Sequence, residues 1–497
     1  MKLQFLGATT TVTGSQYLLT TDRARVLVDC GMFQGAPHET AHNRSGFAFD
    51  PRGLDAMLLT HAHLDHCGMT PVLAREGFRG PIHATRPTVE LARLVLLDSG
   101  RLQEEQADAR RERAERIARR MAQGRPAGPD VEAVLREQRP RLSTEIGAPL
   151  YTEADAERCL PQFRPLDYDQ PIDAAPGIRA VFRDAGHILG SAIIEVEARE
   201  ADAEGRERVV RVVFSGDVGR PDAPIIRDPT GIDTGADYVL VESTYGGRTH
   251  EAPAESMDQL ADAVRWVAEQ KGVLLVPAFA IGRTQEVVWT LDRLLEQGRI
   301  PRLPLFLDSP MGSGASGIYR RFPGYYDDET HRLLAEGDTP LDYPEQAVTR
   351  TANESRAIER SPRPYIVVAS NGTLTGGRVV HHFNNLVGDP RALVLFVGYQ
   401  GQGTVGAHLQ SGARRVRVNG AWREVRCQAR SIGGFSAHAD EPELVDWLRH
   451  FARGPRRPKR VFVVHGDPEG VEAMVARVRE LGLEPYSPAW RETVDLA

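Results

Sequence analysis

The sequence predicts an α/β fold in which a second domain, built from a parallel sheet and helices, is inserted into the first. Strand-like runs in the first half end at residues capable of chemistry, the usual arrangement of an α/β active site. From about Gly247 the strands become almost continuously apolar and alternate with helical stretches, which is typical of a parallel sheet covered on both faces. Residues 460–468 then repeat the first style, with a strand, a histidine and a helix, which indicates a return to the first domain.

The expected elements follow from these patterns in chain order. Strands of the first domain lie at residues 25–29, 56–60, 209–217 and 238–242. The inserted domain contributes the apolar runs GVLLVP, PLFLDS, YIVVAS and ALVLFVGY, with a helix over residues 283–297. We therefore place the first domain at residues 1–246, the inserted domain at residues 247–410, and the C-terminal part of the first domain at residues 411–497.

Composition narrows the class of protein. A chain of 497 residues is too long for one hydrophobic core, and 41% hydrophobic with 26% charged residues is typical of a soluble globular protein. The N-terminus alternates apolar and polar residues, unlike a signal peptide, and no apolar run is long enough to cross a bilayer. The four cysteines form no CxxC pair, which argues against a disulfide framework and a thiolate metal site. We expect a cytoplasmic protein without membrane contact.

Charge places a limit on phosphate binding. The formal net charge of -7 means that the field of the whole molecule weakly repels a polyanion, so any phosphate site must be local. One segment, residues 101–121, is polar and arginine-rich, and its Glu-to-Arg spacings of four residues are those of stabilising helix pairs. A solvated surface helix is the simpler interpretation of this segment, and an arm that faces the substrate is the alternative.

The segment HAHLDH, residues 61–66, places three imidazoles and one carboxylate directly after the strand AMLLT. Imidazole and carboxylate ligands suit zinc and similar ions, and a loop lets closely spaced side chains converge. One ion cannot readily use all of them, so further ligands are expected at other strand ends, where histidines or aspartates stand beside small residues. A capping aspartate or a core histidine would explain each of these residues singly, but not the set. The candidate ligands are His61, His63, Asp65, His66, His187, Asp217 and His465.

Together with Glu242 in VESTYG, His438 in GGFSAHAD and His465 in VHGD, this pattern resembles the β-CASP nucleases of the metallo-β-lactamase superfamily. That group includes the cleavage and polyadenylation endonuclease and its bacterial and archaeal RNA-processing relatives. The resemblance extends from Asp29 to His465 and is weakest in the arginine-rich segment. It implies a metallo-β-lactamase αββα sandwich with an inserted β-CASP cap domain, whose parallel sheet is flanked by helices.

The resemblance also implies roles for the candidate ligands. It implies two zinc ions, one held by His61, His63 and His187, the other by Asp65, His66 and His465, with Asp217 bridging them. Asp29 matches the family's first motif and would orient a ligand histidine from outside the cluster. A simple turn residue at the strand end is the alternative for Asp29.

The implied reaction is hydrolysis of phosphodiester bonds in single-stranded RNA, in RNA processing or decay. Two divalent ions that share a carboxylate provide hydroxide between them at neutral pH and neutralise the phosphate oxygens. The resemblance makes His438 the proton donor to the leaving oxygen, with Glu242 orienting the imidazole and raising its pKa. Capping of the helix that starts near Pro442 is the structural alternative for the His438 segment.

The inserted domain is expected to grip the substrate through glycine-rich loops. SNGTLTGGR, residues 370–378, follows a strand and offers backbone N–H groups and a hydroxyl to phosphate oxygens, with a tight turn as the alternative. It resembles the family's phosphate-gripping loop, although Asn371 and Thr373 are slightly unusual there. We expect His381 and His382 to pack their helix. The expected substrate contacts are Arg283, Ser309, Ser370, Gly372, Gly376, Gly377 and Arg378.

The residues leave other functions to be weighed. A DNA-repair nuclease of the same superfamily is the nearest, although DNA-directed members tend to carry valine where this chain has His465. A small-molecule hydrolase of thioesters or lactams has no evident need for Glu242 or His438, and an inactive RNA-binding subunit conflicts with the complete ligand set. The sequence does not distinguish cleavage within a strand from cleavage at an end. A homodimer is one implied state, because family members are often dimers.

Overall fold

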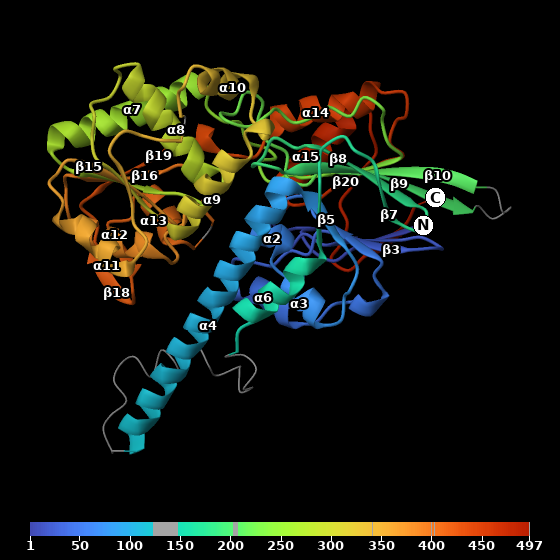
Figure 1. Ribbon diagram of the computed structural model, residues 1–497, viewed down its shortest axis with the longest axis horizontal. Helices are drawn as coiled ribbons and strands as arrows, with labels where there is room; N and C mark the ends of the chain where they lie inside the picture. The colour runs from blue at the N-terminus through green and yellow to red at the C-terminus, as the bar shows by residue number, and fades with distance from the viewer. Residues whose placement is uncertain (123–147, 202–206, 340, 399, 402, 497) are drawn as a thin grey trace.

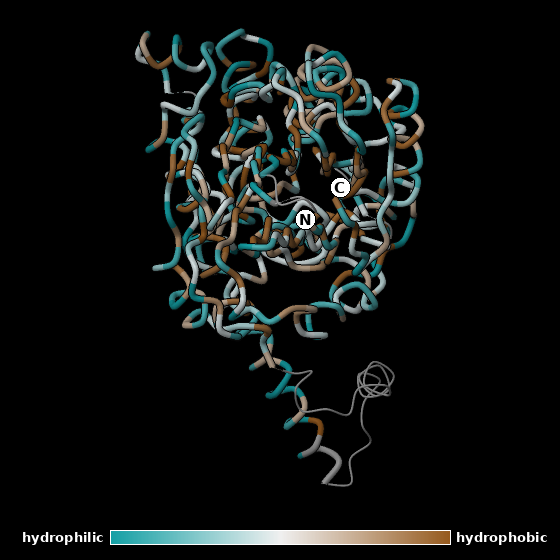
Figure 2. The backbone as a smooth tube through the Cα atoms, turned by 90° about the vertical axis from the view of Figure 1, so that its right-hand side faces the viewer, coloured by the Kyte–Doolittle hydropathy of each residue, from teal (hydrophilic) through white to brown (hydrophobic). Residues whose placement is uncertain are grey.

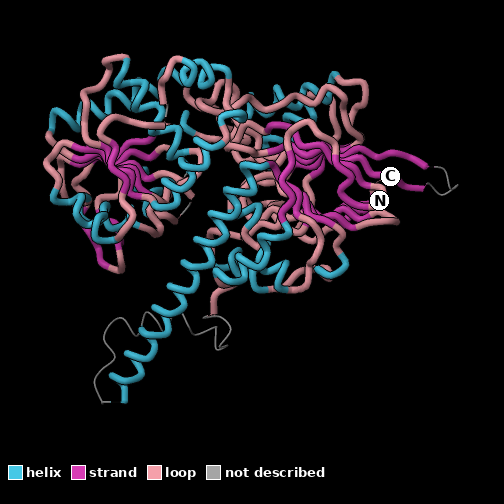
Figure 3. The backbone as a smooth tube through the Cα atoms, in the orientation of Figure 1, coloured by secondary structure: helices cyan, strands magenta, loops and turns pink. Residues whose placement is uncertain are grey.

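The computed structural model describes residues 1–122, 148–201, 207–339, 341–398, 400–401 and 403–496, which form two bodies side by side (Figure 1). Two facing seven-stranded sheets and their helices form the body that we call the sandwich (Figure 3). A six-stranded sheet and its helices form the body that we call the cap. Both chain termini lie in the sandwich (Figure 1).

The sandwich has four layers, with helices outside two sheets. The sheet orders are β22-β1-β2-β3-β4-β5-β6 and β21-β20-β11-β10-β9-β8-β7. A shared apolar core that includes Phe5, Phe182 and Phe462 fills the space between them. Helices α2, α3, α4 and α6 cover the outer face of the first sheet, and α14 and α15 cover that of the second. This confirms the expected αββα sandwich.

The strands of the sandwich lie close to the apolar runs that predict them. The first sheet consists of β1 (Lys2–Phe5), β2 (Tyr17–Thr20), β3 (Arg25–Val28), β4 (Ala56–Leu58), β5 (Ile82–Thr85), β6 (Phe163–Leu166) and β22 (Thr493–Asp495). The second consists of β7 (Ile172–Ala175), β8 (Ile178–Asp184), β9 (Ala192–Ala201), β10 (Glu207–Phe214), β11 (Tyr238–Val241), β20 (Arg460–Val463) and β21 (Pro485–Tyr486). Its helices are α1 (Pro37–Thr40), α2 (Leu64–Cys67), α3 (Thr70–Arg75), α4 (Arg86–Ala122), α6 (Glu153–Cys159), α14 (Glu441–Arg453) and α15 (Pro468–Glu480).

The cap sheet is parallel throughout, in the order β14-β13-β15-β12-β16-β19, as expected from its continuously apolar strands. One apolar core joins its first face to α7 and α8, and another joins the opposite face to α12 and α13. Its strands are β12 (Val273–Pro277), β13 (Leu305–Asp308), β14 (Gln346–Val348), β15 (Tyr365–Ala369), β16 (Ala392–Phe396) and β19 (Gln428–Ser431), beside the hairpin β17 (Arg415–Val418) and β18 (Ala421–Glu424). Its helices are α7 (Pro253–Gln270), α8 (Arg283–Glu296), α9 (Pro310–Arg321), α10 (Asp328–Ala335), α11 (Ala352–Ala357), α12 (Arg378–Leu386) and α13 (Val405–Gln410).

The cap takes its last strand, β19, from beyond residue 410, where the sequence analysis ends the inserted domain. β19 pairs in parallel with β16, from Leu393 opposite Gln428 to Phe396 opposite Ser431. Pairing between strands that are distant in sequence leaves no mark on local periodicity. On this pairing we propose Ser431, rather than residue 410, as the end of the cap.

The longest helix, α4, connects the two bodies. Leu91 and Val95 pack into the sandwich core, and Arg321 of α9 in the cap donates a hydrogen bond to Glu90 at 2.8 Å. The helix stays in contact with the sandwich as far as Ala107, which is buried, and then projects into solvent (Figures 1 and 2). The helix expected over residues 101–121 is therefore present, and it begins already at Arg86. Among the described helices, none has the length and apolar character needed to cross a bilayer.

Candidate metal centre and active site

The ligand loop, residues 61–66, follows β4 and includes the single turn of α2. Its first two histidines precede α2, and Asp65 and His66 lie on that turn. The backbone N–H of Ser15 donates to the carbonyl of Asp65 at 2.8 Å and holds the turn in place. Gly31 is required beside it, because a Cβ there would lie 1.6 Å from the Asp65 carbonyl oxygen. This close packing makes the four side chains of the loop converge.

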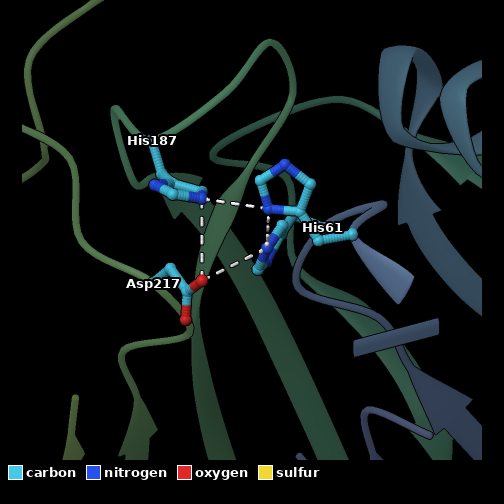
Figure 4. Close-up of side chains that lie close together, drawn as sticks. His61, His187 and Asp217 are labelled. Atoms are coloured by element: carbon cyan, nitrogen blue, oxygen red, sulfur yellow. Dashed lines mark hydrogen bonds and ion pairs between the residues drawn. The ribbon is translucent and has the colours of Figure 1, made fainter. Parts of the chain in front are cut away.

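One set of ligand atoms comes from His61, His63, His187 and Asp217 (Figure 4). Nε2 of His61 lies 3.1 Å from Nδ1 of His63 and 3.4 Å from Oδ2 of Asp217. Nε2 of His187 lies 3.2 Å from the same His63 nitrogen and 3.6 Å from the same Asp217 oxygen. All four atoms lie within 4.8 Å of one another, a spacing that suits the ligands of a single ion.

A second set consists of Asp65, His66 and His465, beside the other oxygen of Asp217. Nε2 of His66 lies 3.2 Å from Nε2 of His465 and 3.2 Å from Oδ1 of Asp217. Nε2 of His465 lies 3.6 Å from Oδ2 of Asp65 and 3.6 Å from Oδ1 of Asp217. The two oxygens of Asp217 thus face different sets, which is the geometry that a bridging carboxylate requires.

The two sets differ in their electrostatics. Burial lowers the pKa of His63 to about 4 and holds the pKa values of His61 and His187 well below their usual range. A neutral imidazole carries the lone pair that binds a metal ion, so protons compete weakly in the first set. In the second set the Asp217 carboxylate outweighs burial and raises the pKa values of His66 and His465. An ion bound there must displace a proton.

Asp217 provides a test of whether these residues fit a metal. Its Oδ1 is buried and accepts no hydrogen bond within the described part of the chain. Although burial raises the pKa of Asp217, the imidazoles of His465 and His66 lower it well below its usual range. This ionised, buried oxygen faces the ring nitrogens of His66 and His465 at 3.2 and 3.6 Å, and a metal ion can take the place of the protons between them. The arrangement therefore fits metal ions between the two sets of nitrogen ligands.

Asp29 contacts the second set through His66, at the ring nitrogen that faces away from the other ligands. Its Oδ2 lies 2.7 Å from Nδ1 of His66, so Nε2 of that ring points toward Asp217. The backbone N–H of Thr60 donates to Oδ1 of Asp29 at 2.8 Å, and the Thr60 hydroxyl donates to Oδ2 at 2.8 Å. Asp29 and His465 have φ values of 58° and 51°, a backbone region that residues other than glycine seldom adopt. Both side chains are turned toward the cluster at the ends of their strands.

The buried Glu242 and the partly exposed His438 form a pair at the edge of the cluster. The carboxylate oxygens of Glu242 lie 3.1 and 3.2 Å from Nδ1 of His438, which is 3.9 Å from Oδ2 of Asp217. Burial opposes the protonated imidazole, but the Glu242 carboxylate raises the pKa of His438 to about 9. A proton donor therefore stands beside the ligands at neutral pH. The N-terminal capping residue of helix α14 is Asp440, whose side chain accepts a hydrogen bond from the backbone N–H of Glu443 at 3.0 Å.

The cap reaches the metal centre through the loop before α8. A Cβ on Gly282 would lie 2.9 Å from Ile188, the residue after the ligand His187. Arg283, the first residue of α8, is buried, and its Nη1 donates to Glu286 at 2.5 Å. Nε of Arg283 has no hydrogen-bond partner within the described residues. One expected substrate contact thus retains a donor close to the ligand loops.

The other expected substrate residues lie where β13 and β15 end. The hydroxyls of Ser309 and Ser370 lie 2.8 Å apart, and the loop of residues 370–378 connects β15 to α12 as expected. Gly376 has open space around the position of a Cβ, whereas Gly372 lies against the ring of Phe279. Gly377 has a φ of 76°, which only glycine adopts readily.

Arg378 is directed into the cap. Its Nη1 donates to Oδ1 of Asp308 at 2.7 Å, and its Nη2 donates to the carbonyl of Arg350 at 2.8 Å. His382 is buried, with Nε2 2.6 Å from Oδ2 of Asp308, and His381 pairs with Glu359. Arg378 and His382 therefore join α12 to the end of β13, the packing role expected for His382.

Three residues that the sequence analysis does not single out support the site. Thr60 holds Asp29, and the Thr244 hydroxyl lies 3.2 Å from Nδ1 of His465. Nη1 of Arg220 donates to the carbonyl of Gly434 at 2.6 Å, in the loop that leads to His438. The two threonines stand next to motif residues, and that position could have identified them from the sequence. No sequence pattern marks Arg220, because the residue it contacts is distant in the chain.

Family models match three stretches of the chain. Residues 9–137 match the metallo-beta-lactamase superfamily, and residues 284–409 match the Beta-Casp domain. Residues 422–488 match the Zn-dependent metallo-hydrolase RNA specificity domain. The ligand loop and His465 each fall within one of these matches, and the Beta-Casp match covers the middle part of the cap.

Curated relatives align with nearly the whole chain. Ribonuclease TTHA0252 of Thermus thermophilus is 35% identical over 474 residues, which is 95% of each chain. Transcription termination factor FttA of Methanosarcina mazei is 29% identical over 507 residues, covering 100% of this chain and 72% of the relative. The FttA protein of Cenarchaeum symbiosum is 30% identical over 511 residues, covering 100% of this chain and 71% of the relative.

Proposed function

The chain belongs to the β-CASP family of the metallo-β-lactamase superfamily, and on this basis we propose that it is a zinc-dependent ribonuclease that hydrolyses phosphodiester bonds in single-stranded RNA. The observation that carries the proposal is the position of the Glu242–His438 pair beside two ligand sets that share Asp217. Simple metallohydrolysis has no need of such a pair, whereas phosphodiester cleavage needs a proton donor for the departing oxygen. The relative named Ribonuclease TTHA0252 supports RNA as the substrate.

We assign two zinc ions to the cluster. His61, His63 and His187 would hold one, Asp65, His66 and His465 the other, and Asp217 would bridge them. Such ions, when bound, supply an activated water and neutralise phosphate oxygens. Asp29 orients His66 through its hydrogen bond to Nδ1.

In this assignment His438 holds the proton that the leaving oxygen needs. Nδ1 of His438 faces the Glu242 carboxylate, which leaves Nε2 as the nitrogen that faces the substrate. Glu242 holds the ring through this contact and keeps it protonated. Its own carboxylate is held by the backbone N–H of Val218 at 2.8 Å.

The cap loops would hold the RNA backbone. We propose Arg283, Ser309, Ser370, Gly372, Gly376, Gly377 and Arg378 as the residues that contact it or shape the contact. Because both terminal nitrogens of Arg378 already bond within the cap, backbone N–H groups of residues 370–378 are the better direct donors, apart from those of Thr373 and Thr375, which donate to Asn371. Nε of Arg283 is buried and without a hydrogen-bond partner among the described residues, so contact with a phosphate requires this side chain to move.

Digestion of end-labelled single-stranded RNA, with the same sequence as DNA in parallel, tests the function. We expect cleavage of RNA that stops when a chelator removes the metals and returns with added zinc. Sizes of the products distinguish cleavage within the strand from cleavage at an end. Equal or faster cleavage of DNA would instead support the DNA-repair alternative, and turnover of a thioester alone would support a small-molecule hydrolase.

Location and assembly complete the proposal. We place the enzyme in the cytoplasm, which the ribonuclease relative supports, and we propose a homodimer from the family resemblance. Light scattering of the purified protein tests the second point. A mass of one chain at all concentrations would contradict the dimer.

A further inference from the structure

The N-terminal end of α4 lies beside a loop of the metal centre. The Thr88 hydroxyl, in the first turn of α4, donates at 2.8 Å to the carbonyl of Gly190, in the loop that carries His187. Leu94 lies against Gly314 of the cap helix α9. The first half of α4 is therefore fixed to a ligand loop and to the cap at once.

We call the second half of α4, from Arg101 onward, the arm. It contacts the sandwich as far as the buried Ala107 and then projects into solvent (Figures 1 and 2). At 1.5 Å per residue the 37-residue helix is about 55 Å long. Every side chain from residue 108 to residue 116 is exposed. The sequence RRERAER of residues 110–116 holds four arginines and two glutamates, in a chain whose net charge is negative. The arm is thus a local positive region on a molecule that otherwise repels polyanions.

The arginines of the arm fall into two groups. One group is paired with carboxylates three or four residues away, which stabilises the exposed helix. These pairs are Arg101 with Glu105 at 2.6 Å, Arg111 with Asp108 at 3.5 Å, and Arg119 with Glu115 at 3.1 Å.

Arg110, Arg113 and Arg116 form the other group, which we call the arginine row. None of the three makes an ion pair or hydrogen bond within the described parts of the chain. At 3.6 residues per turn they share one face of the helix, Glu115 lies on the other, and Glu112 lies at the edge of the row, four residues before Arg116. Three guanidinium groups thus form a line along the arm, and two of them, Arg110 and Arg113, have no carboxylate three or four residues away.

We propose that the arginine row binds the phosphate backbone of the RNA strand beyond the catalytic cleft, so that the arm tethers long substrates. This inference rests on the proposed ribonuclease function. Guanidinium groups spaced along a helix match phosphates in charge and in hydrogen-bond geometry, and they do so without regard to base sequence. The same helix contacts the loop of His187 at Thr88, and the row begins 22 residues further along, about 33 Å at 1.5 Å per residue. Only an RNA strand long enough to cover that distance can occupy the cleft and the row together.

The test replaces the row and, as a matched control, the paired group. One variant carries Arg110→Gln, Arg113→Gln and Arg116→Gln, and the other carries Arg101→Gln, Arg111→Gln and Arg119→Gln. Both lose three positive charges from the same helix, and glutamine is a good helix former. Binding of a short and a long fluorescent single-stranded RNA is measured by anisotropy with chelator present, across a series of salt concentrations.

We expect the row variant to bind the long RNA at least about tenfold more weakly. The slope of log affinity against log salt should fall by about two units, because each of the three lost single-strand phosphate contacts contributes about 0.7. The control variant should bind the long RNA as the parent does, and all three proteins should bind and cleave the short RNA alike. Lysine at the three row positions should restore most of the binding. Circular dichroism checks that α4 remains helical.

Equal losses in both variants would show that only bulk charge acts, and no loss in the row variant would show that the arm does not touch RNA. Either result overturns the inference. If the parent cleaves the short RNA, the proposed function stands whatever the arm does. If the parent cleaves no RNA, the proposed function itself fails.

Discussion

His438 links the electrostatics of the cluster to its chemistry. Its imidazole contacts Glu242 and lies near Asp217, but it belongs to neither proposed ligand set. We expect His438→Ala to retain the zinc content of the parent and to lower kcat on RNA by about 10² to 10⁴, the usual cost of losing a general acid. Metal analysis and single-turnover kinetics on the same preparation measure both quantities. Loss of zinc would instead make His438 a ligand or a support of one.

Glu242 sets the pH range in which His438 is protonated. Because the pKa of His438 is raised to about 9, its protonated form is present at neutral pH and is lost as pH rises through that value. Glu242→Gln removes the largest influence that raises this pKa and leaves burial opposed only by Asp217 and Asp65, so the alkaline fall in kcat should move to lower pH. The amide oxygen of glutamine still accepts the bond from Val218, which limits structural change. An unmoved alkaline limb in a pH profile of kcat would contradict the assignment.

Asp217 should bind both ions, because its two oxygens face different ligand sets. Removing one charged oxygen in Asp217→Asn should therefore lower zinc content from about two per chain toward zero, whereas His63→Ala should weaken mainly the first site. Inductively coupled plasma analysis after zinc reconstitution measures the stoichiometry. A parent protein that never exceeds one zinc per chain would rule out the two-ion assignment.

At the scale of elements, the end of β13 is held to α12 by one buried carboxylate. Asp308 is fully buried and accepts bonds from Arg378 and His382, and further bonds from Ser355 at 2.5 Å and from Thr349. These donors outweigh burial and hold the pKa of Asp308 well below its usual range. The loop of residues 370–378 therefore depends on this carboxylate for its position.

Asp308→Ala should destabilise the cap by about 3 kcal/mol, because it leaves buried donors, one of them charged, without an acceptor. Ser355→Ala removes a single donor and should cost about 1 kcal/mol. Thermal unfolding followed by calorimetry measures both, and the metal content of both variants should equal that of the parent. Equal stability of Asp308→Ala and the parent would show that the network does not hold the loop.

At the scale of the whole molecule, the cap and the sandwich meet beside the metal centre, where Gly282 packs against Ile188. A duplex is wide and stiff, whereas a single strand can pass between two bodies and present its phosphates to the cap loops one at a time. We expect single-stranded RNA to be cleaved much faster than the same strand annealed to its complement. Initial rates on both forms at equal concentration measure this, and equal rates would mean that the substrate does not pass beneath the cap.

The sequence by itself determined the α/β class, the parallel cap sheet and the candidate ligands. These features are local: an apolar run predicts a buried strand, and four ligand-type side chains within residues 61–66 are conspicuous without any fold. The helix of residues 283–297 was likewise visible, and α8 ends within one residue of it.

Only the tertiary structure decided how these parts combine. The assignment of β19 to the cap, the role of Arg220, and the inward direction of Arg378 all depend on partners far away in the chain. The pKa of His438 is set by burial and by Glu242, from a strand that lies 196 residues earlier. Periodicity records which residues are buried, but contacts between distant segments, and the charges they bring together, exist only once the chain has folded.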